Sequence, residues 1–209
     1  MGIMERIDKI DAQPVPSFGL PSARGLTFEE FEDMCSRLRP DVKLQLIEGL
    51  AILVNPPSHM HNLIGSNLCW LMNSVFRSHN VNLRALQEVG VRVPGVEGFA
   101  AIADIAVTSG TAEEGSYPAR IHFAAEVLSP SNTNFEMDSK RARYAEHPHI
   151  EHVVFIAHHT VRAVQLDRSD GWREQVLDGP SARLRLSAFD LDLPLGDLYE
   201  GTKLAEART

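Results

Sequence analysis

The stretch IHFAAEVLSPSNTNFEMDSKRARYAE, residues 121–146, places an apolar strand, a turn and a polar helix in direct succession. The residues from Ile121 to Leu128 are apolar except at two positions, which predicts a strand. Ser-Pro-Ser-Asn ends this strand, and a helix is expected from about Asn134 to Glu146, before Pro148 stops it. A strand followed at once by a helix is typical of domains in which helices cover a sheet.

Further helices and strands are expected on both sides of this segment. Thr27 and Glu30 have the spacing of a capping box, so a helix should begin at Thr27 and end by Pro40. A longer helix with one apolar stripe is expected from Ser58 to Ser78. The predicted strands cover residues 44–54 (a strand pair), 85–93, 100–107, 153–157, 161–166 and, after an SDGW turn, 173–177. This order predicts an α/β or α+β fold in which helices flank a mixed β-sheet.

Length, composition and charge limit the class of protein. The chain has 209 residues, 44% of them hydrophobic, which favours one domain at residues 27–209 after an extended arm at residues 1–26. The formal net charge of −8 repels phosphate, so only a locally basic groove would favour nucleic acid. Cys35 and Cys69 are expected to be reduced core residues. With no signal sequence and no apolar run long enough for a membrane span, the protein is expected in the cytoplasm.

Two carboxylates lie inside otherwise apolar strands. Asp104 interrupts the strand at residues 100–107, and Glu126 interrupts the strand at residues 121–128. Removing such a charge from water costs several kcal/mol unless it is compensated. If the two side chains converge, Mg²⁺ or Mn²⁺ is the natural compensation, because hard oxygen ligands suit these ions. The alternative is that each carboxylate caps a strand end through backbone N–H groups.

The helix after Glu126 carries a basic cluster, Lys140, Arg141 and Arg143, which is able to face phosphate. The alternative for Lys140 is a surface ion pair with Glu136 one helical turn earlier, worth only about 0.3–0.5 kcal/mol. The sequence leaves both alternatives open.

Histidines are a further candidate group for chemistry. His147, His149 and His152 span a turn broken by proline, and they would bind zinc only with a fourth ligand from elsewhere in the chain.

Three stretches, QLIEGLAILVNPPSHMHNLI, AIADIAV and AEVLSPSNTNFEMDSKRARYAE, resemble the “putative restriction endonuclease” family, also called Uma-two. The resemblance covers about residues 27–200, and the EVLSPS element followed by the Lys-Arg-x-x-Tyr helix is its most distinctive part. That family belongs to the PD-(D/E)xK nuclease superfamily. The resemblance therefore implies a restriction-endonuclease-like α/β fold, DNA as the substrate and Mg²⁺ (or Mn²⁺) as the cofactor.

Carried over by position, the resemblance implies that Asp104 and Glu126 are metal ligands. It implies that Lys140, which lies on the following helix, positions or activates the attacking water. The family has an acidic residue where this chain has Gln45, and Glu48 stands at a second acidic position, so either residue would complete the site.

The resemblance also implies the residues that contact substrate. The family tends to carry histidine at His61, which would lie near the site or make a hydrogen bond at the helix start. Arg141 and Arg143 are candidates for binding phosphate. Ala103 replaces the proline of the PD motif, and with Gln45 it is the main departure from the family pattern.

The sequence therefore predicts a Mg²⁺-dependent phosphodiesterase resembling a DNA endonuclease. One alternative is a weakly active or inactive nuclease-fold protein that acts as a binding or assembly module, favoured by Gln45, Ala103 and the net charge of −8. A second is a structural protein in which the carboxylates pair with Arg or Lys and bind no metal. A homodimer, with the N-terminal arm on a second subunit, is a further option.

Overall fold

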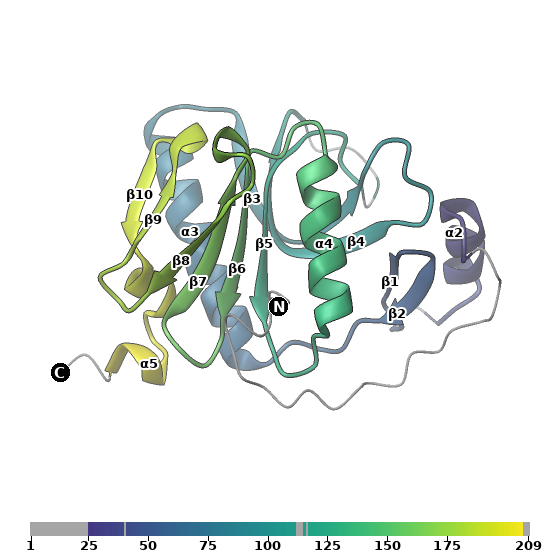
Figure 1. Cartoon of the computed structure of the whole chain (residues 1–209), viewed down its shortest axis with the longest axis horizontal. Coiled ribbons are helices and arrows are strands. Elements are labelled where there is room, and N and C mark those ends of the chain that lie inside the picture. The colour runs from purple at the N-terminus through teal and green to yellow at the C-terminus, as the bar shows by residue number, and fades with distance from the viewer. Residues whose placement is uncertain (1–24, 40, 112–114, 116, 207–209) are drawn as a thin grey trace.

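An eight-stranded mixed sheet forms the centre of the structure (Figure 1). The computed structural model describes residues 25–39, 41–111, 115 and 117–206, so nearly all of the predicted N-terminal arm lies outside the described residues. The strands of this sheet are β1 (Leu44–Ile47), β2 (Leu50–Leu53), β3 (Leu83–Arg92), β4 (Ala100–Ser109), β5 (Ile121–Leu128), β6 (His152–Ala157), β7 (Arg162–Asp167) and β8 (Glu174–Asp178). Their order is β2-β1-β4-β5-β6-β7-β8, with β3 also paired to β4. Only β5 and β6 are parallel among the described pairs of this sheet, which makes it mixed as predicted.

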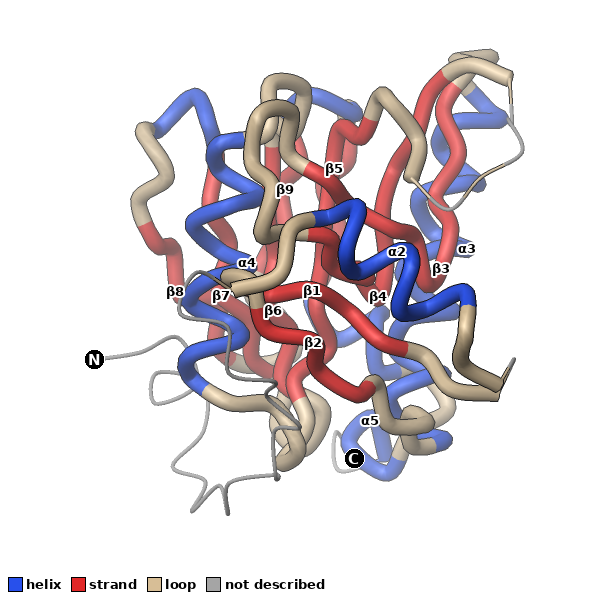
Figure 2. Tube along the Cα trace, turned by 90° about the vertical axis from the view of Figure 1, so that its right-hand side faces the viewer, coloured by secondary structure: helices blue, strands red, loops and turns tan. Residues whose placement is uncertain are grey.

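Helices cover the two faces of the sheet. Helix α4 (Asn134–Glu146) lies on one face, and α3 (His59–Ser78) lies on the other together with the small hairpin of β9 (Arg183–Leu186) and β10 (Leu191–Pro194) (Figure 1). Helix α2 (Phe28–Ser36) packs beside β1, as Figure 2 shows. The remaining short helices are η1 (Arg168–Asp170), η2 (Ser187–Phe189), η3 (Leu195–Tyr199) and α5 (Lys203–Glu206). Among the described residues, no helix is both long and apolar enough to cross a membrane.

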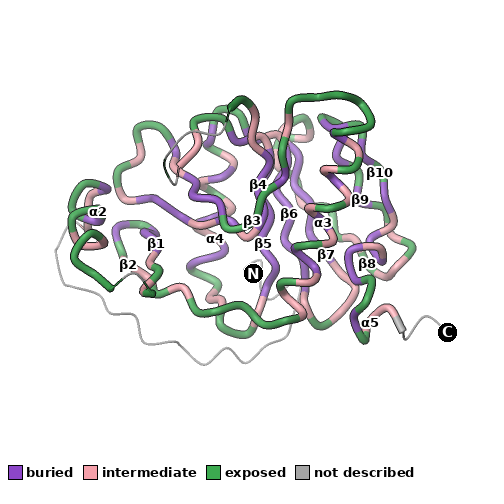
Figure 3. The backbone as a smooth tube through the Cα atoms, turned by 180° about the vertical axis from the view of Figure 1, so that it is seen from behind, coloured by how far each residue is buried: buried purple, intermediate pink, exposed green. Residues whose placement is uncertain are grey.

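Alternating residues of the central strands supply the two cores. In β6, Phe155 packs toward α4 with Met137, whereas Val154 and Ile156 pack toward α3. Figure 3 shows that buried residues follow β4, β5 and β6 along most of their length. A strand buried on both faces reads as a nearly continuous apolar run, so any charged residue inside it stands out.

The predicted elements up to β8 are confirmed, with ends that differ by a few residues. Thr27 caps α2 in a complete capping box with Glu30, and Ser58 caps α3. No element was predicted after residue 177, where the chain forms β9, β10 and the turns around them. The signal was available, because Arg-Leu-Arg-Leu and Leu-Asp-Leu alternate charged with buried apolar residues, as in a half-buried strand.

A tight turn joins β1 to β2 and contacts distant parts of the chain. Glu48 and Gly49, the two residues of the turn, have φ angles of 49° and 78°, as a two-residue hairpin turn with two left-handed positions requires. The Gly49 N–H donates to the Gly98 carbonyl, and its own carbonyl accepts from Leu26 N–H. A Cβ on Gly49 would lie 2.8 Å from the Cα of Gly25.

Gly49→Ala is expected to lower the free energy of unfolding by about 2–5 kcal/mol, because it combines left-handed strain with a backbone clash. Gly95→Ala is the matched control, since Gly95 has φ +80° and no heavy atom within 4 Å of its ideal Cβ. The control should lose only about 1–2 kcal/mol. Urea denaturation measures the free energy of unfolding of both variants. Equal losses would show that the close approach of Gly49 to Gly25 adds nothing to the cost of the substitution.

Candidate active site

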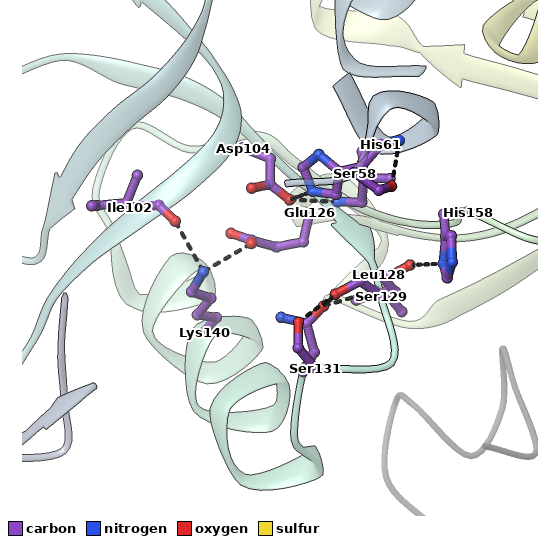
Figure 4. A network of polar contacts seen from close by, with 12 residues as sticks. Ser58, His61, Ile102, Asp104, Glu126, Leu128, Ser129, Ser131, Lys140 and His158 are labelled. Atoms are coloured by element: carbon purple, nitrogen blue, oxygen red, sulfur yellow. Dashed lines mark hydrogen bonds and ion pairs between the residues drawn. The ribbon is translucent and has the colours of Figure 1, made fainter. Parts of the chain in front are cut away.

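Asp104 and Glu126 lie side by side where the ladder between β4 and β5 ends. The last printed pair at this end joins Ile105 to Ala125. Continuing the same antiparallel register places Asp104 opposite Glu126, and directly opposed residues point to the same face of a sheet. The structure therefore brings the two carboxylates together (Figure 4).

The Asp104 side chain occupies an opening in the sheet. Its Oδ2 accepts a hydrogen bond from Val127 N–H at 2.8 Å, so this carboxylate satisfies a backbone donor of β5 where the ladder ends. On the other side, the β3–β4 register skips the pair that would join Glu88 to Asp104, and Glu88 has a left-handed φ of 53°. A non-glycine residue in this conformation carries strain, which is common beside functional sites. Asp104 thus accepts a backbone N–H, as the strand-capping alternative expected, but this is only one of its contacts.

His61, in the first turn of α3, is the second partner of Asp104. Its Nε2 lies 3.0 Å from Asp104 Oδ2. Burial lowers the pKa of His61, but the hydrogen bond to Asp104 and the charges of Asp104 and Glu126 outweigh burial and raise it. The contact therefore favours an imidazolium beside the carboxylate.

Glu126 is compensated from helix α4. Lys140 Nζ donates to Glu126 Oε2 at 2.8 Å, and Tyr144 Oη donates to Glu126 Oε1 at 2.7 Å. Lys140 also donates to the Ile102 carbonyl at 2.9 Å (Figure 4). Glu136, Lys140 and Tyr144 stand four residues apart along α4, a spacing that puts them on one face of the helix, here toward the sheet.

The structure does not bear out the alternative for Lys140, a surface ion pair with Glu136. The side chains of Lys140 and Glu126 are only 4% and 3% exposed, and Glu136 lies farther from Nζ, at 3.8 Å. The basic side chain is thus a buried countercharge for the carboxylates.

Burial and charge set the protonation of this pair. Burial raises the pKa of the Glu126 carboxyl to about 8; Lys140 opposes this shift and Asp104 adds to it. Burial alone would lower the pKa of Lys140, but the carboxylates of Glu126, Glu136 and Asp104 raise it overall. Burial also raises the pKa of Tyr144, followed by the effect of Glu126. Lys140 and Tyr144 therefore remain proton donors to Glu126.

Glu136 is a site residue that the sequence analysis treated only as a surface partner. It is 6% exposed, and its Oε1 accepts a hydrogen bond of 2.6 Å from Gln45 Nε2. The amide oxygen of Gln45 accepts from Ile102 N–H at 3.4 Å. One signal for Glu136 was available in the sequence. Polar residues at positions 136, 140 and 144 recur every four residues, so they lie on one face of a helix that is expected to cover a sheet.

These residues line one cleft of about 920 Å³. Its floor includes Asp104, Glu126, Glu136, Lys140 and Gln45, and His61 lies on its wall. Most other lining residues come from four segments: β2 and the residues after it, the first half of α3, β3 at Gln87 and Glu88, and the SPSNT turn with the start of α4.

Comparison with known proteins identifies the family and supports the fold. Residues 28–196 match the family described as “Putative restriction endonuclease”. The chain belongs to this family. A crystal structure described as a “putative nuclease” from Anabaena variabilis is similar in fold, with a TM-score of 0.68 over 83% of this chain and 97% of that chain, at 21% identity. No curated protein matches the chain.

Three residues that the family resemblance suggested for the site lie outside the cleft. Arg143 binds Glu48 through two hydrogen bonds of 2.7 and 2.6 Å, and Arg141 pairs with Glu174 at 3.1 Å. In an α-helix, position 141 is rotated by about 100° from position 140, so Arg141 points in another direction than Lys140. Position 143 is only about 60° from position 140, and Arg143 is held outside the cleft by its bonds to Glu48. Glu48 lies in the β1–β2 turn, where the hydrogen bond from Arg143 lowers its pKa. The structure therefore does not bring Glu48, Arg141 and Arg143 to the carboxylates and Lys140.

The donor chemistry of the cleft fits Mg²⁺ or Mn²⁺. Asp104 and Glu126 supply hard carboxylate oxygens, and the Asp104 side chain is 27% exposed. Mg²⁺ takes one or two protein carboxylates and completes its shell with water and phosphate oxygens.

The described part of the chain contains no group of three or more His, Cys, Asp or Glu side chains able to hold a metal ion, so neither the cleft, with its two carboxylates, nor the histidines at 147, 149 and 152 form such a group. His152 is instead bound to Asp167 at 2.5 Å, and the rings of His147 and His149 lie 6.0 Å apart.

Lys140→Ala is expected to lower the free energy of unfolding by about 3–5 kcal/mol, because it leaves buried carboxylates without their countercharge. Lys43→Ala removes a pair of the same type, 2.6 Å from Glu88, whose side chains are both more than half exposed. That control should cost less than about 1 kcal/mol. Chemical denaturation of both variants measures the difference, and a loss for Lys140→Ala as small as the control's would contradict the compensating role.

Proposed function

We propose that this protein is a metal-dependent phosphodiesterase that cleaves DNA, with Asp104, Glu126 and Lys140 as its central residues. The observation that carries the proposal is their convergence in one cleft of a chain that belongs to the family described as “Putative restriction endonuclease”. Each of the three comes from a different element, and two of them are charges in the sheet core that stability alone does not require.

Asp104 and Glu126 would hold Mg²⁺ or Mn²⁺ through their carboxylate oxygens. When bound, such an ion acts as a Lewis acid toward a phosphate oxygen and lowers the pKa of water. Asp104 is the more exposed ligand and faces the cleft, while Glu126 lies deeper and is held in place by Lys140 and Tyr144.

Lys140 would orient the attacking water and offset charge that develops on the phosphate. An ammonium has three N–H groups, and two of those of Lys140 donate to Glu126 and to the Ile102 carbonyl. The third remains to reach a water molecule or a phosphate oxygen in the cleft. Because the first two bonds fix the position of Nζ, this donor is preorganised before substrate arrives.

His61 would support Asp104. As an imidazolium it offsets the carboxylate charge in the apo protein, and its place in the first turn of α3 puts it at the cleft wall. When a cation binds the carboxylates, His61 is free to turn its charge toward a phosphate.

A nuclease-fold binding protein without catalysis is the second candidate. The observation that favours it is that both carboxylates already have partners, His61 and Val127 N–H for Asp104, and Lys140 and Tyr144 for Glu126. A protein of this kind would not need a metal, so metal binding separates the two candidates.

The first test is thermal stability in the presence of Mg²⁺ or Mn²⁺. The wild type should melt at a higher temperature, because a ligand that binds only the folded state stabilises it by about 2.7 kcal/mol at a hundred times its Kd. Asp104→Asn, which keeps an acceptor for Val127 N–H, should abolish the shift. Asp33→Asn, in an exposed ion pair of α2, should keep it. A shift that persists in Asp104→Asn would place the metal elsewhere.

The second test separates the position of the lysine charge from its presence. Lys140→Arg keeps a positive charge, but a planar guanidinium cannot place a compact ammonium at the same point. Cleavage of DNA should fall by about 10²–10⁴-fold, while the metal-induced melting shift survives and shows that the variant is folded. Arg143→Lys, on the same helix but outside the cleft, should keep full activity. Full activity in Lys140→Arg would show that charge alone suffices.

A further inference from the structure

The lining of the cleft includes exposed apolar side chains from two elements, β2 and α4. Phe135, at the start of α4, is 48% exposed, and Leu50 and Leu53 of β2 are 37% and 46% exposed. Pro56 and Pro57 continue the β2 side. These residues line the same cleft as Asp104 and Lys140, so they are an exposed apolar surface joined directly to the charged floor.

Positive charge in this lining is scarce. Among the described residues that line the cleft, the cationic side chains are Lys140 and His61, and both contact carboxylates. Glu88 adds a negative charge at the edge and is paired with Lys43. A DNA duplex presents stacked bases inside a phosphate surface, and proteins hold it mainly with Lys and Arg. The cleft lacks the charges for that kind of binding.

Unpaired bases fit the same surface well. An exposed base has an apolar face that stacks on aromatic side chains, and this stacking adds about 1–3 kcal/mol per base to the electrostatic attraction of the strand. Phe135 precedes Lys140 by five residues, which is about 7.5 Å along the helix axis. Both side chains line the same cleft. A base stacked on Phe135 would therefore belong to the same strand as a phosphate held near Lys140.

We propose that the cleft takes nucleic acid as an unpaired strand, with one base stacked on Phe135 and held against the apolar side formed by Leu50 and Leu53. This inference rests on the proposed phosphodiesterase function and specifies its substrate class. Phe135 is then a residue that selects substrate, while the carboxylates and Lys140 act on the phosphate.

The test is equilibrium binding of short fluorescein-labelled DNA, followed by anisotropy in Ca²⁺ with the full-length protein. The single strand should bind more tightly than a duplex of the same sequence. Phe135→Ala should weaken single-strand binding by about five- to a hundredfold, the range expected for loss of one base stack, and Phe135→Trp should restore it. Trp70→Ala removes an aromatic side chain that is 68% exposed on α3 and outside the cleft, and it should leave binding unchanged.

A substrate change provides the second measurement. Replacing single bases of the strand by abasic sites should weaken binding to the wild type at one position, and Phe135→Ala should show no further loss at that position. Equal binding of single strand and duplex, or an unchanged affinity of Phe135→Ala, would overturn the inference. Because binding is measured without cleavage, a protein that binds single strands through Phe135 but cleaves nothing would overturn only the proposed function.

Discussion

The buried contact between Glu126 and Lys140 is the interaction on which the rest of the site depends. A carboxylate in the centre of β5 is too costly to bury alone, and a lysine on α4 is too costly to bury without a countercharge. Their 2.8 Å contact, supported by Tyr144 and the Ile102 carbonyl, fixes α4 against the sheet at one rotation about its axis. Arg141 and Arg143 of the same helix stay outside the cleft, in ion pairs with Glu174 and Glu48.

Regular strand pairing is interrupted on both sides of Asp104. The β4–β5 ladder ends beside it, the β3–β4 register skips it, and Glu88 adopts a left-handed conformation on the neighbouring strand. Each of these features weakens the sheet locally, and a hydrogen bond from Val127 N–H to the carboxylate recovers only part of the loss. Local strain and missing pairs of this kind are expected where a structure serves a site instead of its own stability.

The neutral side chain at position 45 has a physical reason in this chain. Gln45 donates to Glu136 at 2.6 Å, and a carboxylate in its place would meet Glu136 as a like charge in a buried environment. The cleft floor already carries Asp104, Glu126 and Glu136 against Lys140 and His61. The amide at 45 and the acid at 136 together give a stable arrangement, so the departure of Gln45 from the family pattern is not by itself a sign of lost function.

The sequence by itself determined the elements up to β8, the family, and the two lone carboxylates, because an acid inside an apolar strand is visible without a structure. It also placed Lys140 on the helix that follows Glu126. Only the tertiary structure decided which polar residues of that helix are buried against the sheet, namely Glu136, Lys140 and Tyr144, while Arg141 and Arg143 form ion pairs outside the cleft. The same holds for the contact of His61 with Asp104 and for the place of Glu48 outside the cleft. These outcomes depend on register and helix rotation, which are set by the packing of segments far apart in the chain and leave no local pattern in the sequence.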